Sequence, residues 1–187
     1  MATKTWTLDP MHSELQFKVK HLMVSNVTGN FKDFQVEVVS PTGDFTDATV
    51  TATVQVASVS TGPADRDKHL VSADFFDAEK YPEMKFVSTA FTRQDDDDYI
   101  LEGKLTIKDV TRPVKLRAEF VGTVRDPWGN IKSAFSLSGK INRNDWGLSY
   151  NAALETGGVL LSEEVRILAE VQMTEVVAQE AKETVEA

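Results

Sequence analysis

The three histidines, His12, His21 and His69, are the side chains of this chain best suited to acid–base or metal chemistry. His12 and His21 lie nine residues apart, which places them on opposite faces of an ideal strand. The chain has no HxH or HExxH pair for zinc, no G-x-S-x-G elbow and no glycine-rich phosphate loop. We therefore predict no metal and no cofactor. We expect His12 to bond a turn and His21 to be a half-buried polar group, while a lipid-modifying enzyme that uses either histidine stays an alternative.

Arg143 and Asp145 are a second pair of interest, because residues two apart share a face when the chain is extended. They could form an ion pair or caps that hold the last turn, with Trp146 packed beside them as a plug. Alternatively, Arg143 could reach the mouth of a cavity and meet the polar head of a ligand. The pattern alone leaves both interpretations open.

The composition is that of an ordinary soluble domain, with 41% hydrophobic and 26% charged residues in 187. A net charge of −9 argues against binding to nucleic acid or to an anionic membrane. The absence of cysteine excludes disulfides, thiolate metal sites and cysteine nucleophiles. No apolar run approaches the ~18 residues of a spanning helix, and no signal peptide is visible, so a cytoplasmic location is expected.

Alternation of polar and apolar residues runs through most of the chain, as at Leu15, Phe17 and Val19 among charged neighbours. A period of two with one apolar side is typical of a strand with one face away from water. About eight such stretches, joined mostly by short turns, indicate an antiparallel barrel or a two-sheet sandwich. Several stretches run ten or more residues, which favours the tilted wall of a barrel.

The period changes only after Pro63, and we predict one short helical insertion over about 63–78, ended by Tyr81-Pro82. We expect Leu70, Phe75 and Phe76 to turn inward from it. Residues 1–175 are predicted to form a single domain. The acidic segment 176–187 is predicted to be a disordered or weakly helical tail.

The apolar side of the stretch 48–56 is made of alanine and valine alone. Such small side chains either let another layer approach or leave room for a ligand. An eight-stranded barrel has an interior that is filled by side chains or holds one small molecule. The small residues favour a cavity, although a filled core that serves only as an interaction module stays possible.

Motifs spread along the chain resemble those of the YceI-like family. Each motif is weak alone, but together they cover residues ~4–175 and are specific. They are Trp6-x-Leu8-Asp9-Pro10-x-His12-Ser13, Gly29-x-Phe31, His69-Leu70-x-Ser72-x-Asp74-Phe75-Phe76-Asp77, Lys80-Tyr81-Pro82, Gly103-x-Leu105-Thr106-Ile107, Thr111-x-Pro113-Val114 and Arg143-x-Asp145-Trp146-Gly147-Leu148.

The resemblance implies an all-β, lipocalin-like, eight-stranded antiparallel barrel that binds, stores or transports a long-chain amphiphile: a polyisoprenoid, an isoprenoid quinone, or a fatty acid or amide. It also implies the cytoplasmic branch of the family and a possible homodimer, and no enzymatic activity is expected. The expected head-group residues are His12, His21 or Arg143. The expected cavity lining is Phe17, Phe34, Val36, Val54, Leu70, Phe75, Phe86, Phe120, Phe135, Leu137 and Trp146.

Overall fold

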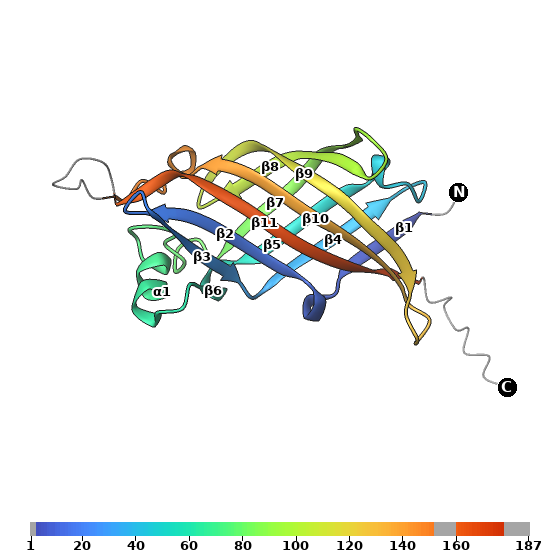
Figure 1. The fold of residues 1–187 in the computed structure, drawn as a ribbon, viewed down its shortest axis with the longest axis horizontal. Helices are drawn as coiled ribbons and strands as arrows, with labels where there is room; N and C mark the ends of the chain where they lie inside the picture. Colours follow the sequence, from blue (N-terminus) through green and yellow to red (C-terminus); the bar gives the residue numbers. More distant parts are fainter. Residues whose placement is uncertain (1–2, 152–159, 178–187) are drawn as a thin grey trace.

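The structure, a computed structural model, describes residues 3–151 and 160–177 (Figure 1). The strands are β1 (Lys4–Leu8), β2 (Glu14–His21), β3 (Ser25–Phe31), β4 (Phe34–Ser40), β5 (Thr49–Gln55), β6 (Val59–Ser60), β7 (Glu83–Arg93), β8 (Asp98–Ile107), β9 (Val110–Arg125), β10 (Ile131–Asn142) and β11 (Leu161–Val176). The helical segments are α1 (Ala64–Val71) and the short 3₁₀ turns η1 (Pro10–His12), η2 (Phe45–Asp47), η3 (Val56–Ser58) and η4 (Arg143–Trp146).

In the part of the chain that the structure describes, eleven strand segments build a barrel whose wall has eight positions, all paired antiparallel. The sheet closes where β1 pairs with β11, with Thr5 opposite Val176 and Leu8 opposite Met173. Three wall positions are each made of two segments end to end: β1 with β2, β3 with β4, and β5 with β6. The predicted eight-stranded antiparallel barrel is confirmed, and the sandwich is excluded.

The interruptions in these three wall positions lie beside one another. Pro10 starts η1, and the preceding Asp9 still donates its backbone N–H to Gln172 O of β11 at 2.8 Å. In the next two positions, Gln55 N donates to Asp33 O at 2.9 Å where the chain bends at η3. Each bend thus keeps hydrogen bonds to its neighbour, so the wall kinks without exposing a free edge to the interior.

The helical insertion lies where the sequence predicted it, but only eight residues, Ala64–Val71, are α-helical. The helix ends at Ser72, whose backbone is extended and whose hydroxyl donates to His69 O at 2.5 Å. Such local side-chain bonds compete with helix continuation. Residues 72–81 therefore continue as turns, which fold Phe75 back to a buried position against the barrel.

The predicted C-terminal tail falls mostly outside the described residues. Val176, the first residue assigned to it, is the last residue of β11 and pairs with Thr5. Residues 178–187 lie in a part of the chain that the structure does not describe, as does the Gly157-Gly158 pair, which from its sequence is predicted to form a turn. No helix within the described residues is long and apolar enough to cross a membrane.

The β2–β3 hairpin has an unusual turn. Val24 N donates to His21 O at 3.2 Å, and the two central residues, Leu22 and Met23, have φ values of 55° and 61°. Hairpin turns with positive φ at both central positions strongly prefer Asn-Gly. Leucine and methionine in this conformation cost about 1–2 kcal/mol each.

We predict that the double substitution Leu22→Asn/Met23→Gly raises the free energy of unfolding by about 1–2 kcal/mol, because it relieves this backbone cost. Urea denaturation measures the change. Val24→Asn is the control, since this substitution leaves both positive-φ residues in place and should bring no gain. A double variant less stable than the parent would contradict the interpretation.

Candidate ligand-binding site

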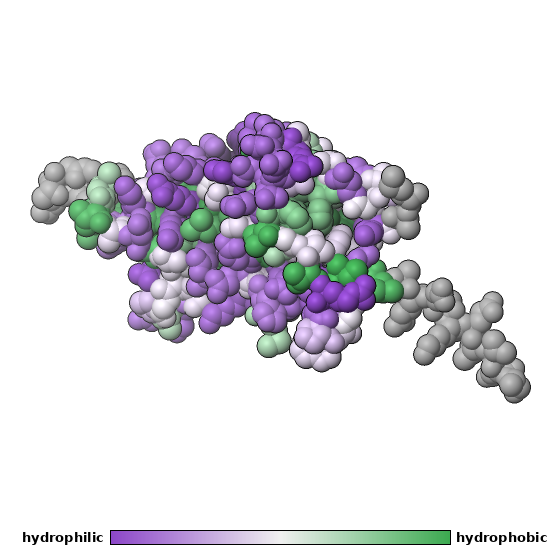
Figure 2. Space-filling model, turned by 45° about the vertical axis from the view of Figure 1, so that its right-hand side comes forward, coloured by the Kyte–Doolittle hydropathy of each residue, from purple (hydrophilic) through white to green (hydrophobic). Residues whose placement is uncertain are grey.

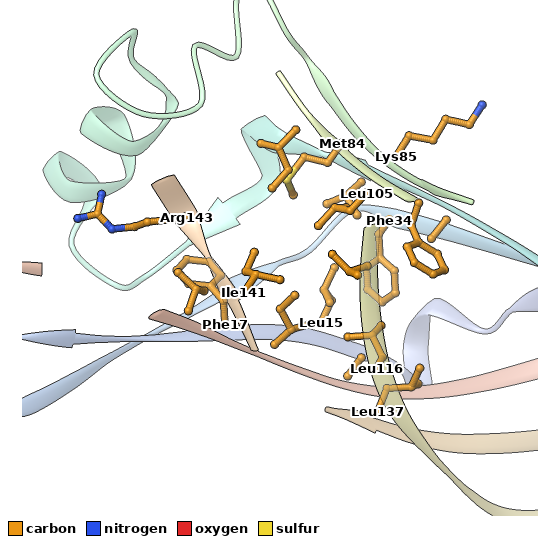
Figure 3. Close-up of a pocket in the computed structure, with 18 of the residues that line it drawn as sticks. Leu15, Phe17, Phe34, Met84, Lys85, Leu105, Leu116, Leu137, Ile141 and Arg143 are labelled. Atoms are coloured by element: carbon orange, nitrogen blue, oxygen red, sulfur yellow. The ribbon is translucent and has the colours of Figure 1, made fainter. Parts of the chain in front are cut away.

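The barrel encloses a cavity of about 480 Å³. Alternate residues of the long strands point into it, so the period-two pattern of the sequence becomes a continuous apolar lining. Figure 3 shows side chains such as Leu15, Phe34 and Leu137 converging from different strands, whereas Lys85 points away. A volume of this size lies within the range of about 300–1,000 Å³ seen for small-molecule sites.

Small residues keep the cavity open. Ala52 and Ala169 line it from opposite parts of the sheet, where larger side chains would fill it. Two glycines have a different role, because the missing side chain leaves room for an aromatic ring to pack directly against the strand. Gly29 is directly opposite Phe17 on β2, and a Cβ on Gly29 would stand only 2.2 Å from the Phe17 ring. Gly103 is covered in the same way, since a Cβ on it would stand 2.4 Å from the Phe86 ring.

A cluster of aromatic rings closes one end of the barrel. Phe45, carried by η2, lies 5.0 Å from Phe135 and 5.6 Å from Trp6 between ring centroids. Phe91 stacks on Tyr99 at 5.0 Å beside them. Edge-to-face and offset pairs at such distances are favourable beyond the area they bury. Asp44 and Asp47 hold the η2 turn by bonds to Thr46 N and to the buried Ser40 hydroxyl, which positions Phe45.

Apart from Lys85, the polar residues that border the cavity gather at the other end, near α1. They are His21, Thr61, Arg66, His69, Arg143 and Tyr150. Arg66 is already bound there, because its Nε donates to Thr61 Oγ1 at 2.8 Å. His69 Nε2 lies 2.8 Å from Asp74 Oδ2, and its ring packs edge-on against Tyr150. The mouth of the cavity is therefore at the α1 end.

Arg143 is the most buried charged residue of the mouth, with 4% of its surface exposed. Asn142 caps η4 by accepting from Asn144 N, and Gly147 ends it with φ 74°, so that Arg143 in the first position turns inward. Its Nε donates to Ser162 O at 2.8 Å, and its Nη1 donates to the backbone oxygens of Leu148 and Tyr150.

The Nη2 group of Arg143 is buried and finds no hydrogen-bond partner among the described residues. Burial lowers the pKa of this guanidinium, and the charge of Glu163 partly opposes that effect. An arginine nevertheless stays protonated in proteins. The Nη2 group is closed to solvent in this structure, so a ligand oxygen would reach it only if neighbouring side chains at the mouth moved. A ligand oxygen that did reach it would satisfy a buried charged donor.

The first sequence interpretation was that Arg143 and Asp145 form an ion pair or caps that hold the last turn. Arg143 does hold the backbone after η4, at Leu148 and Tyr150, but not through an ion pair with Asp145. The guanidinium is held by backbone carbonyls, and the ion pairs found among the described residues do not include Asp145. Asp145 instead accepts from Arg112 Nε through its backbone oxygen at 3.3 Å. Trp146 does pack as a buried side chain, donating Nε1–H to Leu105 O at 2.9 Å.

Most of the residues that the sequence assigned to the lining border the cavity. They are Phe17, Phe34, Val36, Val54, Leu70, Phe75, Phe86, Phe135 and Leu137, together with His21 and Arg143 at the mouth. Phe120 and Trp146 do not border it. Phe120 packs at the closed end against Phe45 and Phe135, and Trp146, on η4, packs in a buried hydrophobic cluster that includes Leu148.

His12 lies outside the cavity. It is on η1, its side chain is 63% exposed, and its Nδ1 is 2.9 Å from Asp9 Oδ2. Lys132 Nζ lies 3.0 Å from the same carboxylate oxygen. Burial acts to raise the pKa of Asp9, but the bonds from His12 and Lys132 outweigh it and lower that pKa. His12 therefore bonds a turn, the simpler of the two roles considered for it.

Sequence reasoning missed Phe45, Arg66 and Tyr150. None of them lies in a strand: Phe45 begins η2, Arg66 lies in α1 and Tyr150 follows η4, so the alternation of the strands gives no information about their direction. For Phe45 a signal was present, because an aromatic residue between Asp44 and Asp47 is unusual for an exposed loop. Within the described residues, no group of three or more His, Asp or Glu side chains could hold a metal ion.

A closed antiparallel barrel with an apolar cavity and one polar mouth defines the class of small-ligand-binding barrels. The YceI-like domain model matches residues 6–173, and the chain belongs to the YceI-like family. A UPF0312 protein of Staphylococcus epidermidis is 40% identical over 170 residues, which cover 90% of this chain and 96% of that protein.

Solved structures share the fold. The YceI protein of Campylobacter jejuni has a TM-score of 0.74 and 35% identity, covering 86% of this chain and 91% of its own. A polyisoprenoid binding domain from Saccharophagus degradans has a TM-score of 0.63 at 14% identity, covering 91% and 98%. At that identity, the second likeness concerns the fold alone.

We predict that Gly29→Ala pushes the Phe17 ring into the cavity. Because the ring has open space to enter, the free energy of unfolding should fall by only about 1 kcal/mol. Binding of an apolar fluorescent probe, N-phenyl-1-naphthylamine, should weaken because the cavity becomes narrower. Thr28→Ala, on the outward face of the same strand, should leave probe binding unchanged. Unaltered probe binding by Gly29→Ala would show that Phe17 is not displaced inward.

Proposed function

We propose that the protein binds a long-chain amphiphile, with the apolar chain along the barrel and an oxygen of the head at Arg143. The observation that carries the proposal is one continuous cavity, apolar along its length, that ends at a buried guanidinium with an unused Nη2. Storage or transport of a polyisoprenoid, an isoprenoid quinone, or a fatty acid or amide would follow from such binding. We also propose that the protein is cytoplasmic and that residues 1–175 form a single domain.

The apolar chain supplies most of the affinity in this proposal. A lipid of about 25–30 heavy atoms that gains about 0.3 kcal/mol per atom is bound with roughly 8–9 kcal/mol. That free energy corresponds to a dissociation constant of about a micromolar. Apolar contact discriminates poorly among chains of similar length, so selectivity for the tail would be coarse.

In this proposal, Arg143 selects the head group of the ligand both by its positive charge and by the direction in which its Nη2 group can donate a hydrogen bond. Nε and Nη1 of Arg143 are already used by three carbonyl oxygens, so only Nη2 is left to donate. Charged donors form the stronger hydrogen bonds, and a buried one without an acceptor is costly. Any ligand with a carbonyl, hydroxyl or charged oxygen at one end would remove that cost. The polyisoprenoid binding named for the S. degradans domain is compatible with this chemistry.

The two other functions considered from the sequence have less support. A filled interaction module is disfavoured by the cavity itself. A lipid-modifying enzyme would need a positioned base inside the cavity. His12 is outside the barrel, and the His69–Asp74 pair at the mouth is partly exposed on both side chains. His21 lines the cavity, but its imidazole forms no hydrogen bond with an Asp or Ser side chain among the described residues that would position it as a base. We therefore propose binding without turnover.

Ala169→Phe should abolish binding, because a phenyl group at this lining position blocks the middle of the cavity. The test is to extract the purified protein with organic solvent, identify lipids by mass spectrometry, and measure uptake of an isoprenoid quinone. The matched control is Glu170→Phe, the outward-facing neighbour on β11, which should take up as much as the parent. A parent protein that is free of lipid and takes up no quinone would overturn the proposal.

Arg143→Met should lower the free energy of unfolding by about 3 kcal/mol, since three backbone carbonyls lose a donor. It should also weaken binding of a long-chain fatty acid by about tenfold, the usual value of one charge-assisted bond. Binding of an alkane of equal length, which has no head, should not change. Equal weakening for both ligands would mean that Arg143 is structural only. Calorimetric titration with the two ligands separates these outcomes.

A further inference from the structure

The tip of the β2–β3 hairpin, residues 22–24, presents three apolar side chains in succession to solvent. Leu22 is 41% exposed, Met23 56% and Val24 85%. Single exposed apolar residues are common on proteins, but a contiguous group at a projecting tip marks an interaction site. Figure 2 shows a hydrophobic group at one end of the molecule, on a face that is otherwise mostly hydrophilic but carries further hydrophobic groups toward its middle and its other end.

The backbone of the tip adds an independent argument. Leu22 and Met23 both have positive φ, in a turn where Asn and Gly are the favoured residues. The turn therefore has apolar side chains at the expense of stability. Strain of this kind concentrates at functional positions, which points to a role for the exposed side chains themselves.

The tip adjoins the mouth of the cavity. Leu22 N donates to Leu160 O at 2.9 Å, and His21 pairs with Leu161 of β11. His21, Leu160 and Leu161 all line the cavity. An apolar surface thus continues from the exposed tip to the interior of the barrel, and a lipid chain that crosses it stays out of water.

The tip is too small to hold a second copy of the chain. A stable protein interface buries about 800 Å² on each partner, far more than three side chains provide. Nor is the protein suited to an anionic membrane, because the chain carries a net charge of −9. The side chains that remain to form contacts are apolar, and an uncharged bilayer accepts them.

We infer that residues 22–24 insert into a zwitterionic phospholipid bilayer and place the mouth of the cavity against it, so that an amphiphile passes between bilayer and barrel. The role in transfer rests on the proposed function, whereas insertion does not. The docked orientation sets the β2–β3 end toward the membrane and the β9–β10 end away from it, since these hairpins lie at opposite ends of β11 (Figure 1).

The opposite end offers a matched control. Val121, Val124 and Trp128, on β9 and the turn that follows it, are also exposed, but that end of the barrel is closed by the aromatic cluster of Phe45, Phe91 and Phe135. Val121→Asp therefore places the same charge on an exposed valine that is far from the mouth.

The test is co-sedimentation of the ligand-free protein with phosphatidylcholine vesicles. Val24→Asp, and separately Leu22→Asn/Met23→Gly, should lower the bound fraction by about tenfold, while Val121→Asp should bind like the parent. The double variant is expected to be more stable than the parent, so loss of binding by it cannot be a failure to fold. Transfer of a fluorescent fatty acid from the vesicles should slow by a similar factor in the tip variants.

Four results would overturn insertion by the tip: tip variants that sediment like the parent, loss of binding by Val121→Asp instead, binding that requires anionic lipid and disappears in salt, or a tip variant whose mass in solution falls from dimer to monomer. If the parent sediments and the tip variants do not, but neither the parent nor any variant takes up fatty acid, insertion stands and the proposed function fails. The two ideas are thus tested separately.

Discussion

Closure of the sheet by the pairing of β1 with β11 is the constraint on which the rest of the structure depends. β1 has only five residues, yet it bonds β11 on one side and β4 on the other. Closure satisfies the backbone groups of the wall without the help of a filled interior. Because the backbone pairing stabilises the wall, the interior does not have to be completely packed with side chains. Small residues such as Ala52 and Ala169 can therefore leave a cavity there.

The two ends of the barrel differ in their side chains: one end is closed by aromatic rings and the other is a polar mouth. Rings around Phe45 and Phe135 close one end, where close packing excludes water. The other end stays polar, and the guanidinium of Arg143 binds the backbone of residues 148, 150 and 162 together. The same side chain thus supports the mouth and keeps one donor group free in it. Structure and recognition are joined in one residue, which is why neither of the two sequence interpretations of Arg143 describes it fully.

The errors of the sequence interpretation have a common origin. Alternation tells which face of a strand is apolar, but not how far along the barrel axis a residue lies. Phe120 was predicted to line the cavity from a strand, and it does lie on a strand, but it packs against Phe45 at the closed end, beyond the cavity. Trp146 and His12 lie in 3₁₀ turns, where no period applies. The helix was predicted too long because Ser72 stops it locally, and its hydroxyl bond to His69 O is not visible in a hydrophobic pattern.

The amino-acid sequence by itself determined that the chain consists of about eight antiparallel strands and that it belongs to this family, because these depend on local periodicity, short turns and motifs of fixed spacing. Only the tertiary structure decided that three wall positions are broken and that the cavity is open toward α1. It also decided that Leu22 and Met23 meet solvent beside the mouth. These features arise from contacts between segments far apart in the chain, such as residue 22 with residue 160, and no local pattern records such distances.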